Sequence, residues 1–222
     1  MRASATYASV LSLLSASTVN AQCASGVHII SANGVIEGGV GKIGEFMTAL
    51  QAKVPGSDTE AIPFNQPYAA YVQAQPAVLA DVVSRATSYA QKCPDTPIVL
   101  AGLNRGAHAV MDAVCGASSD QFTATEPLPV DVLSKIAAVV TFSDYSWLPG
   151  QLWSRGDATG PSTYPRKNPA GCDPVVTKIA SYCAAKDPWC DKQTTDFVEN
   201  AYLPAKIPEA VDFVVSQLGN KA

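Results

Sequence analysis

The sequence has 222 residues, of which 47% are hydrophobic and 15% are charged. A chain of this length can bury a substantial core as one domain without a metal ion. Its 15 basic and 19 acidic residues give a formal net charge of -4, which excludes the strongly basic surface that nucleic-acid binding requires.

The first 21 residues have the pattern of a secretory signal peptide. Arg2 supplies a positive charge, a short apolar region is centred on residues 10–14, and Val19-Asn20-Ala21 forms a small-residue cleavage pattern. The apolar region is too short to cross a bilayer, and no later stretch reaches the roughly 18 apolar residues of a transmembrane helix. We therefore expect a secreted, extracellular protein without a transmembrane segment, whose mature part, residues 22–222, is a single domain.

Strand and helix patterns alternate along the mature chain, which is typical of a parallel sheet with crossover helices. The predicted strands cover residues 26–32, 59–64, 97–103, 136–142 and 175–181. The predicted helices cover residues 46–54, 76–90, 105–114 and 207–218. Pro76 is expected in the first turn of its helix and Pro208 near the start of the last helix, with Gly219 just after that helix as its C-cap.

Six cysteines follow the predicted cleavage site: Cys23, Cys93, Cys115, Cys172, Cys183 and Cys190. An even number of cysteines in an exported chain is most simply explained by three disulfides. No pair of them has zinc-finger spacing with accompanying histidines, so we expect neither a metal site nor a cofactor.

The segment Gly102-Leu103-Asn104-Arg105-Gly106 follows a predicted strand and precedes a predicted helix. Serine hydrolases place Gly-x-Ser-x-Gly at such a turn, where two glycines let the backbone tighten and expose the central side chain. The central residue here is Asn104, whose amide nitrogen has a delocalised lone pair and does not replace a serine hydroxyl as a nucleophile. The segment therefore predicts a hydrolase turn without the nucleophile.

Other fragments extend this motif over nearly the whole mature chain. They are Val27-His28-Ile29-Ile30-Ser31-Ala32 leading into Gly34 and Glu37, Pro55-Gly56-Ser57 with Glu60-Ala61-Ile62, Cys93-Pro94-Asp95-Thr96, Ala113-Val114-Cys115-Gly116, and Ser181-Tyr182-Cys183 running into Asp187-Pro188-Trp189-Cys190. In order and spacing the chain resembles the cutinase and acetylxylan esterase family of small secreted α/β hydrolases. The resemblance implies an α/β fold, a three-layer α/β/α sandwich with a largely parallel five-stranded sheet.

The resemblance also implies positions for the catalytic residues. Asn104 takes the nucleophile position, Asp187 matches the catalytic acid, and Glu199 takes the position of the histidine base. Two carboxylates at hydrogen-bonding distance repel each other, so Asp187 and Glu199 would share a proton or bind a cation. Neither arrangement reproduces an imidazole that accepts a proton and returns it, so no intact catalytic set is expected.

The oxyanion hole is expected to be altered as well. Val35 and Ile36 precede Glu37 where the family carries a hydroxyl residue and Thr, so one donor is lost. Such a loss costs about 3 kcal/mol of transition-state stabilisation in other hydrolases. The second donor would be the backbone N–H of Arg105, whose side chain is bulkier than the family's usual Gln and is cationic.

No other residue is expected to restore the chemistry. His28 lies in the first strand and His108 falls one helical turn after Asn104, so both are expected to be packed rather than catalytic. Ser143 and Ser146, near the end of the fourth strand, have no base that the sequence makes evident.

Three functions remain open after these substitutions. The first is a secreted, inactive relative of the esterases that binds a cell-wall polysaccharide, a cutin or lipid polymer, or a host protein, as a fungal effector or decoy at a plant surface. The second is an active carboxylic ester hydrolase with an unorthodox site. The third gives Asp187 and Glu199 a role in binding a cation or a glycan. We expect a monomer in each case.

The family pattern also implies disulfide pairs. It joins Cys23 to Cys93 and Cys183 to Cys190, which leaves Cys115 for Cys172. The segment 145–171 is rich in aromatic residues, and the sequence leaves open whether they pack on the sheet or line the rim of the cleft.

Overall fold

A computed structural model describes residues 23–34, 41–64, 66–192 and 202–219. The signal peptide predicted for residues 1–21 lies outside these residues. One sheet runs through the described part, in the order β2-β1-β3-β4-β6-β5, and every neighbouring pair of strands is parallel. The strands are β1 (His28–Ala32), β2 (Asp58–Ile62), β3 (Ile98–Leu103), β4 (Ile136–Phe142), β5 (Ser154–Arg155) and β6 (Ile179–Tyr182).

The sheet has six strands rather than the five predicted. The additional strand, β5, is only two residues long and pairs with Ser181 and Tyr182 at the edge of β6. A strand this short has no alternating pattern that the sequence could reveal. The prediction of a parallel α/β sheet is otherwise confirmed.

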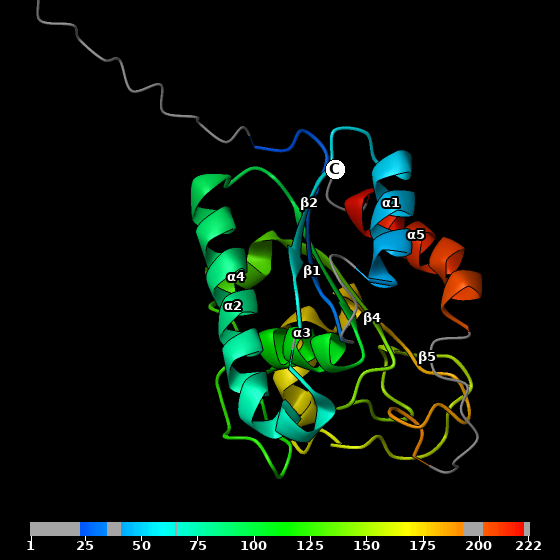
Figure 1. The fold of residues 1–222 in the computed structure, drawn as a ribbon. Helices are drawn as coiled ribbons and strands as arrows, with labels where there is room; N and C mark the ends of the chain where they lie inside the picture. The colour runs from blue at the N-terminus through cyan, green and yellow to red at the C-terminus, as the bar shows by residue number, and fades with distance from the viewer. Residues whose placement is uncertain (1–22, 35–40, 65, 193–201, 220–222) are drawn as a thin grey trace, which may run out of the picture.

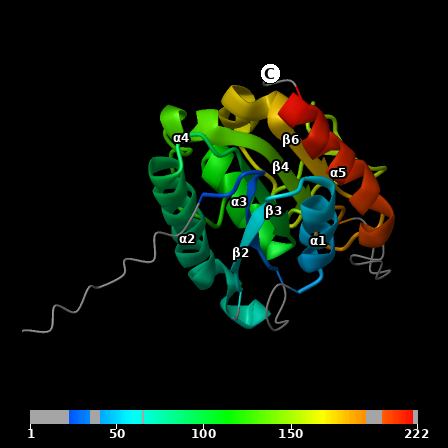
Figure 2. The same ribbon diagram turned by 90° about the horizontal axis from the view of Figure 1, so that it is seen from above.

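Helices cover both faces of the sheet, which gives the predicted three layers (Figure 2). One face carries α2, α3, α4 and the 3-10 helix η2, whereas α1 and α5 lie together on the other (Figure 1). The helices are α1 (Ile43–Lys53), α2 (Tyr71–Lys92), α3 (Arg105–Cys115), α4 (Val130–Lys135), η2 (Pro169–Lys178) and α5 (Leu203–Gly219), with a short 3-10 turn η1 (Tyr68–Ala70) before α2.

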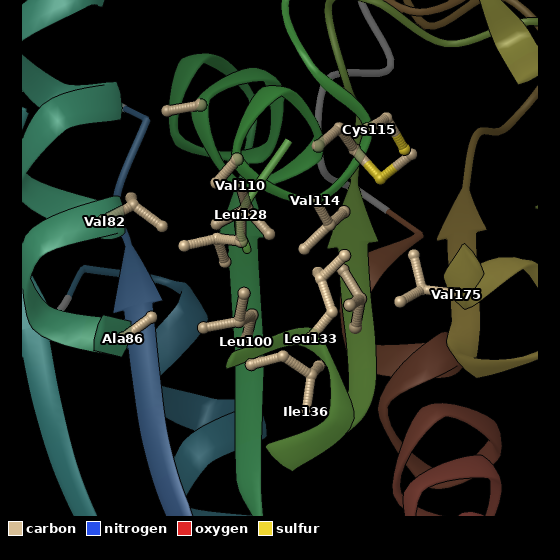
Figure 3. Packing of buried hydrophobic residues seen from close by; sticks show 14 of the residues in the cluster. Val82, Ala86, Leu100, Val110, Val114, Cys115, Leu128, Leu133, Ile136 and Val175 are labelled. Atoms are coloured by element: carbon tan, nitrogen blue, oxygen red, sulfur yellow. The ribbon is translucent and has the colours of Figure 1, made fainter. Parts of the chain in front are cut away.

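The two helical layers enclose separate apolar clusters. Figure 3 shows the first, in which Val110 and Val114 of α3 meet Leu100 of β3, with α2 beside them. The second cluster packs α1 and α5 against the other face of the sheet. It takes the alternate side chains of the same strands, since successive residues of a strand point to opposite faces. All residues of α3 are buried, so this helix is fixed in place directly after β3.

Two helices begin a full turn or more before their predicted starts. Pro76 was expected in a first helical turn and Pro208 near a helix start, but α2 starts at Tyr71 and α5 at Leu203, so both prolines lie inside their helices. Burial of Tyr71 among aromatic rings and of Leu203 in the second cluster adds a turn before each proline. Gly219 is the last residue of α5 rather than the residue after it.

The predicted strand 175–181 is wrong in its first half. Val175 lies in η2, where it is buried in the first apolar cluster, and extended pairing begins at Ile179. An apolar run alone does not separate a buried strand from a buried helical turn. The short helix α4 was not predicted, since its six residues are too few to establish a helical period.

The structure contains three disulfides, in the pairing that the resemblance implied. They join Cys23 to Cys93, Cys115 to Cys172, and Cys183 to Cys190. The second fastens the end of α3 to η2, as Figure 3 shows at Cys115. The third closes a loop just after β6.

The aromatic segment 145–171 packs against the protein rather than standing free. Trp147 and Trp153 are buried, and the indole N–H of Trp147 donates to the carbonyl of Ser181 at 3.3 Å. Leu152, by contrast, is 78% exposed. Within the described residues, no helix is both long enough and apolar enough to span a bilayer.

Candidate functional site

The turn between β3 and α3 has the strained geometry expected of a hydrolase elbow. Asn104 has φ 51° and ψ -117°, a region that residues with a side chain rarely adopt. Two neighbouring glycines make the turn possible, since a Cβ on Gly102 would lie 2.6 Å from the Cα of Ala107. A Cβ on Gly106 would lie 2.1 Å from the carbonyl oxygen of Ala32. The Gly-x-Asn-x-Gly spacing is therefore required by close backbone contacts.

Parallel pairing places three strand ends side by side. The N–H of Asn104, after β3, donates to the carbonyl of Phe142 at the end of β4 at 2.9 Å. The N–H of Ser143, after β4, donates in turn to the carbonyl of Tyr182 at the end of β6 at 2.9 Å. Because the carboxyl ends of parallel strands meet at one sheet edge, side chains that follow β3, β4 and β6 can contact one another.

The side chains at these ends form a buried hydrogen-bonded chain. The amide nitrogen of Asn104 donates to Ser143 Oγ at 3.0 Å, and Ser143 Oγ donates to Asp187 Oδ1 at 2.9 Å. All three residues have 0% exposure. Ser143 also has a positive φ of 53°, although this conformation favours glycine. Asn104 and Asp187 are thus connected through a serine hydroxyl.

Asp187 is held by the loop that the Cys183–Cys190 disulfide closes, the pair that the family resemblance implied. The N–H groups of Trp189 and Cys190 donate to its Oδ1 at 2.9 and 3.3 Å. Burial raises the pKa of the Asp187 carboxyl, and the hydrogen bonds from Trp189, Ser143 and Cys190 oppose that rise, as does the nearby Tyr202 hydroxyl. The other carboxyl oxygen, Oδ2, is buried and has no hydrogen-bond partner in the described part of the chain.

Arg105 has a structural role that its sequence position did not indicate. Its Nε donates to the carbonyl of Gly34 at 2.6 Å, and its Nη1 donates to the carbonyl of Gln66 at 2.8 Å. The guanidinium also lies over the Phe64 ring, 4.5 Å from its centre. The N–H of Arg105 is the first of α3 and so has no partner within the helix. That N–H remains a candidate anion donor, while the side chain fastens two neighbouring segments.

The two predicted site residues Val35 and Glu199 lie outside the described residues, as does Glu37. Their expected roles at an oxyanion hole and at the base position therefore stay predictions. Asn104, Arg105 and Asp187 do lie near one sheet edge. Ser143, which the sequence analysis set aside for lack of a base, joins Asn104 to Asp187. The sequence signal that could have identified Ser143 is its position directly after β4, the neighbour of the strand that precedes Asn104.

His108 belongs to a buried polar network beneath the elbow, as its predicted packing role requires. Its Nδ1 contacts the hydroxyl of Tyr71, and its Nε2 lies 3.2 Å from Asp112 Oδ2. Arg166 donates to Asp112 Oδ1 at 2.8 Å and to Ser146 Oγ at 3.0 Å. Burial lowers the pKa of His108 to about 3 and raises that of Asp112 to about 6. A neutral imidazole is therefore built into the fold.

His28 is also packed, at 5% exposure. Its Nδ1 lies 2.6 Å from Asp58 Oδ1, and its ring stacks on Tyr89 with the centres 3.5 Å apart. The backbone N–H of His108 donates to the carbonyl of Asn104 at 3.1 Å, in the first turn of α3. No cluster of three or more His, Cys, Asp or Glu side chains suited to a metal ion occurs within the described ranges.

The parallel six-stranded sheet, its covering helices and the glycine-flanked elbow define an α/β-hydrolase fold. The family model described as Cutinase matches residues 23–218, and the chain belongs to that family.

Named relatives agree with this membership. A Verticillium dahliae protein called Cutinase 11 is 26% identical over 219 residues, which are 93% of this chain and 73% of that protein. Acetylxylan esterase 2 of Talaromyces purpureogenus is 28% identical over 193 residues, covering 82% and 81% of the two chains. A crystal structure of an acetylxylan esterase at 0.90 Å resolution is 26% identical and superposes with a TM-score of 0.81, over 89% of this chain and all of that one. The catalytic core domain of the Trichoderma reesei acetylxylan esterase gives a TM-score of 0.79 at 26% identity, over 88% of this chain.

Proposed function

We propose that this protein is an extracellular member of the cutinase family that does not hydrolyse esters and acts by binding a cell-wall polymer. The observation that carries the proposal is Asn104, at the tip of the elbow between β3 and α3, with its amide donating to Ser143. In an ester hydrolase this tip presents the attacking hydroxyl. The carboxamide of Asn104 contains no atom of comparable nucleophilicity. In a serine protease, loss of the nucleophile alone lowers kcat by roughly a millionfold.

The Ser143 hydroxyl does not restore the reaction. It donates to Asp187 as a serine donates to a base, but it is fully buried and accepts a hydrogen bond from Asn104. A nucleophile must reach a carbonyl carbon at about 3 Å while its proton leaves to a base. Ser143 is therefore better placed to hold Asp187 than to attack a substrate.

A surface hollow beside the elbow is the place where we propose that the polymer binds. It has a volume of about 490 Å³, and its lining includes Phe64 and Gln66, the two residues that also contact Arg105. Gln73 and Asp81 of α2 add polar groups to an otherwise mostly apolar surface. Amide and carboxylate groups beside apolar surface suit the hydroxyls and ring faces of a polysaccharide. The relatives named acetylxylan esterase make xylan the first polymer to test.

Ester hydrolysis provides the first test. The purified protein is assayed with p-nitrophenyl acetate and butyrate, with and without a serine-directed phosphonate. We expect turnover at the level of the buffer blank and no phosphonate adduct by mass spectrometry. Phosphonate-sensitive turnover would instead establish an active carboxylic ester hydrolase, and the modified peptide would identify its nucleophile.

Restoring the family residues tests the assignment of positions. The variants are Asn104→Ser alone and Asn104→Ser combined with Glu199→His and Val35→Thr. We expect the single variant to stay inactive, because it lacks a base, and the triple variant to gain phosphonate-sensitive turnover. A folded triple variant that remains inert would mean that these positions are not the catalytic ones or that the cleft does not admit an ester.

Polymer binding is tested by retention on insoluble xylan, cutin, chitin and cellulose. The double variant Gln66→Ala and Gln73→Ala should lose retention, whereas Gln121→Ala, an exposed glutamine outside the hollow, should not. Absence of retention on every matrix would count against polymer binding and favour a protein partner.

A further inference from the structure

A second cavity lies between α2 and the segment that follows α3. Its volume is about 360 Å³, which is within the size range of small-molecule sites. Its wall is mostly apolar, with Leu79, Ala80 and Val83 from α2 facing Ala117 and Phe122. None of Asn104, Ser143 and Asp187 lines it, so this cavity is separate from the elbow.

Gln75 gives this cavity a polar group with unused hydrogen-bonding capacity. The residue is 1% exposed, lines the cavity, and its Oε1 and Nε2 make no hydrogen bond within the described residues. The carboxamide lies beside Asp112 and favours its ionised form, but without normal hydrogen-bond geometry. Buried side-chain amides in proteins usually have partners. A free donor and a free acceptor in one buried group therefore point to a ligand that supplies both.

The charges around the cavity restrict that ligand. Asp112, which also lines it, already forms an ion pair with Arg166 through Oδ1 at 2.8 Å, whereas its Oδ2, 3.2 Å from His108 Nε2, makes no hydrogen bond of normal geometry within the described residues. The negative charge of Asp112 is thus balanced by Arg166 inside the protein, so the cavity needs no cationic ligand. Glu126 adds a second acidic residue to the lining, which disfavours an anionic ligand. A neutral molecule is left as the suitable occupant.

We propose that this cavity binds a small neutral molecule with an apolar or aromatic body and a primary amide head group. The head group pairs with Gln75, because two carboxamides can each donate to the other and accept from it. The body lies against Leu79, Val83 and the Phe122 ring, which packs edge-on against His108 with the ring centres 4.9 Å apart. The site is independent of ester chemistry at the elbow.

Benzamide is the probe, titrated into the full mature protein and followed by two-dimensional NMR of the backbone amides. Benzoate and toluene, which lack a neutral amide head group, serve as ligand controls. We expect saturable shifts around Gln75 and Phe122 with benzamide, and binding about tenfold weaker with either control, the effect of losing one or two net hydrogen bonds.

Two variants locate the site. Gln75→Leu keeps the volume but removes the amide, and Val83→Phe fills the cavity, so both should weaken benzamide binding about tenfold or more. Val130→Ala, at a residue that is 78% exposed and outside the lining, should leave it unchanged. If Gln75→Leu does not fold, Val83→Phe decides. The proposal is overturned if benzamide produces no saturable shifts at millimolar concentration, or if it binds both cavity variants as tightly as the natural chain.

Discussion

Asn104 and Ser143 are joined by a 3.0 Å hydrogen bond across the carboxyl ends of β3 and β4, and each has a positive φ, 51° and 53°. A residue with a Cβ pays a conformational cost of about 1–3 kcal/mol in such regions. Two strained residues that directly follow neighbouring strands persist because side-chain hydrogen bonds connect them to each other and to Asp187. The network at this sheet edge therefore stabilises a backbone shape that its residues do not favour.

Substitutions at Ser143 separate the energetic cost of its positive φ from the stability that its hydrogen bonds contribute. Ser143→Ala removes the hydroxyl that binds Asp187 but keeps a Cβ at φ 53°, so we expect a loss of about 2–3 kcal/mol in the free energy of unfolding. Ser143→Gly loses the same hydroxyl but relieves the strain, so its loss should be about 1 kcal/mol smaller. Urea unfolding measures both values. Equal losses would show that the positive φ costs nothing here.

Sequence patterns predicted the parts of the fold where period and length were clear. The strand predicted at 136–142 is β4 as observed, because seven consecutive apolar or β-branched residues are buried on both faces. Patterns failed where burial came from distant partners. Val175 is buried in the first cluster as part of a helical turn, η2, rather than of a strand. The start of α2 depends on aromatic residues from other segments that pack around Tyr71.

The candidate site could be predicted only in part for the same reason. The glycine spacing identified the elbow at Asn104, whereas Asp187 and the disulfide that closes its loop were implied by the family resemblance. Ser143 was set aside because its partner, Asp187, is 44 residues away and meets it only through the parallel pairing of β4 with β6. The links from Arg105 to Gly34 and Gln66 likewise depend on tertiary contacts between distant segments.

The elbow glycines provide a steric prediction with an internal control. Gly106→Ala places a Cβ 2.1 Å from the backbone carbonyl of Ala32, which cannot move without shifting β1, so we expect a loss of about 3 kcal/mol or more. Gly219→Ala, at the exposed end of α5 with no atom within 4 Å of the added Cβ, should change stability by less than about 0.5 kcal/mol. Thermal and urea unfolding of both variants check this. A mild effect at Gly106 would contradict the described approach of α3 to β1.

Arg105 should stabilise the two segments to which it donates hydrogen bonds, at Gly34 and at Gln66. Arg105→Ala removes the donors to the carbonyls of Gly34 and Gln66 and the contact with Phe64, and we expect a loss of about 2–4 kcal/mol. Arg105→Lys should recover less than half of this, because one ammonium group does not reproduce the two-pronged geometry of a guanidinium. Amide hydrogen exchange should become faster in the peptides that contain Gly34 and Gln66. Unchanged exchange there would mean that other contacts hold these segments.

The buried network under the elbow predicts a pH dependence whose sign can be derived from His108. Its pKa is lowered by burial from 6.5 to about 3 in the folded protein, where Tyr71, Asp112, Asp144 and Arg166 surround it. Between these two values the unfolded chain binds a proton that the folded protein does not. Stability contributed by neutral His108 is therefore complete above pH 6.5 and is lost as the pH falls toward 3.

The variant His108→Gln tests this slope. It should be less stable than the natural chain at pH 7, by about 1–3 kcal/mol, because a buried ring and its contacts are lost. That deficit should shrink by up to about 1.4 kcal/mol for each pH unit between 6.5 and 3.

Asp112→Asn is the matched control with the opposite sign. Burial raises the Asp112 pKa to about 6, so the folded protein binds the extra proton and the natural chain loses stability as the pH rises from 3.8 to 6. The deficit of Asp112→Asn should accordingly shrink as the pH rises over that window. Urea unfolding at half-unit pH intervals measures both slopes, and parallel pH profiles for the two variants would contradict a neutral His108 beside a protonatable Asp112.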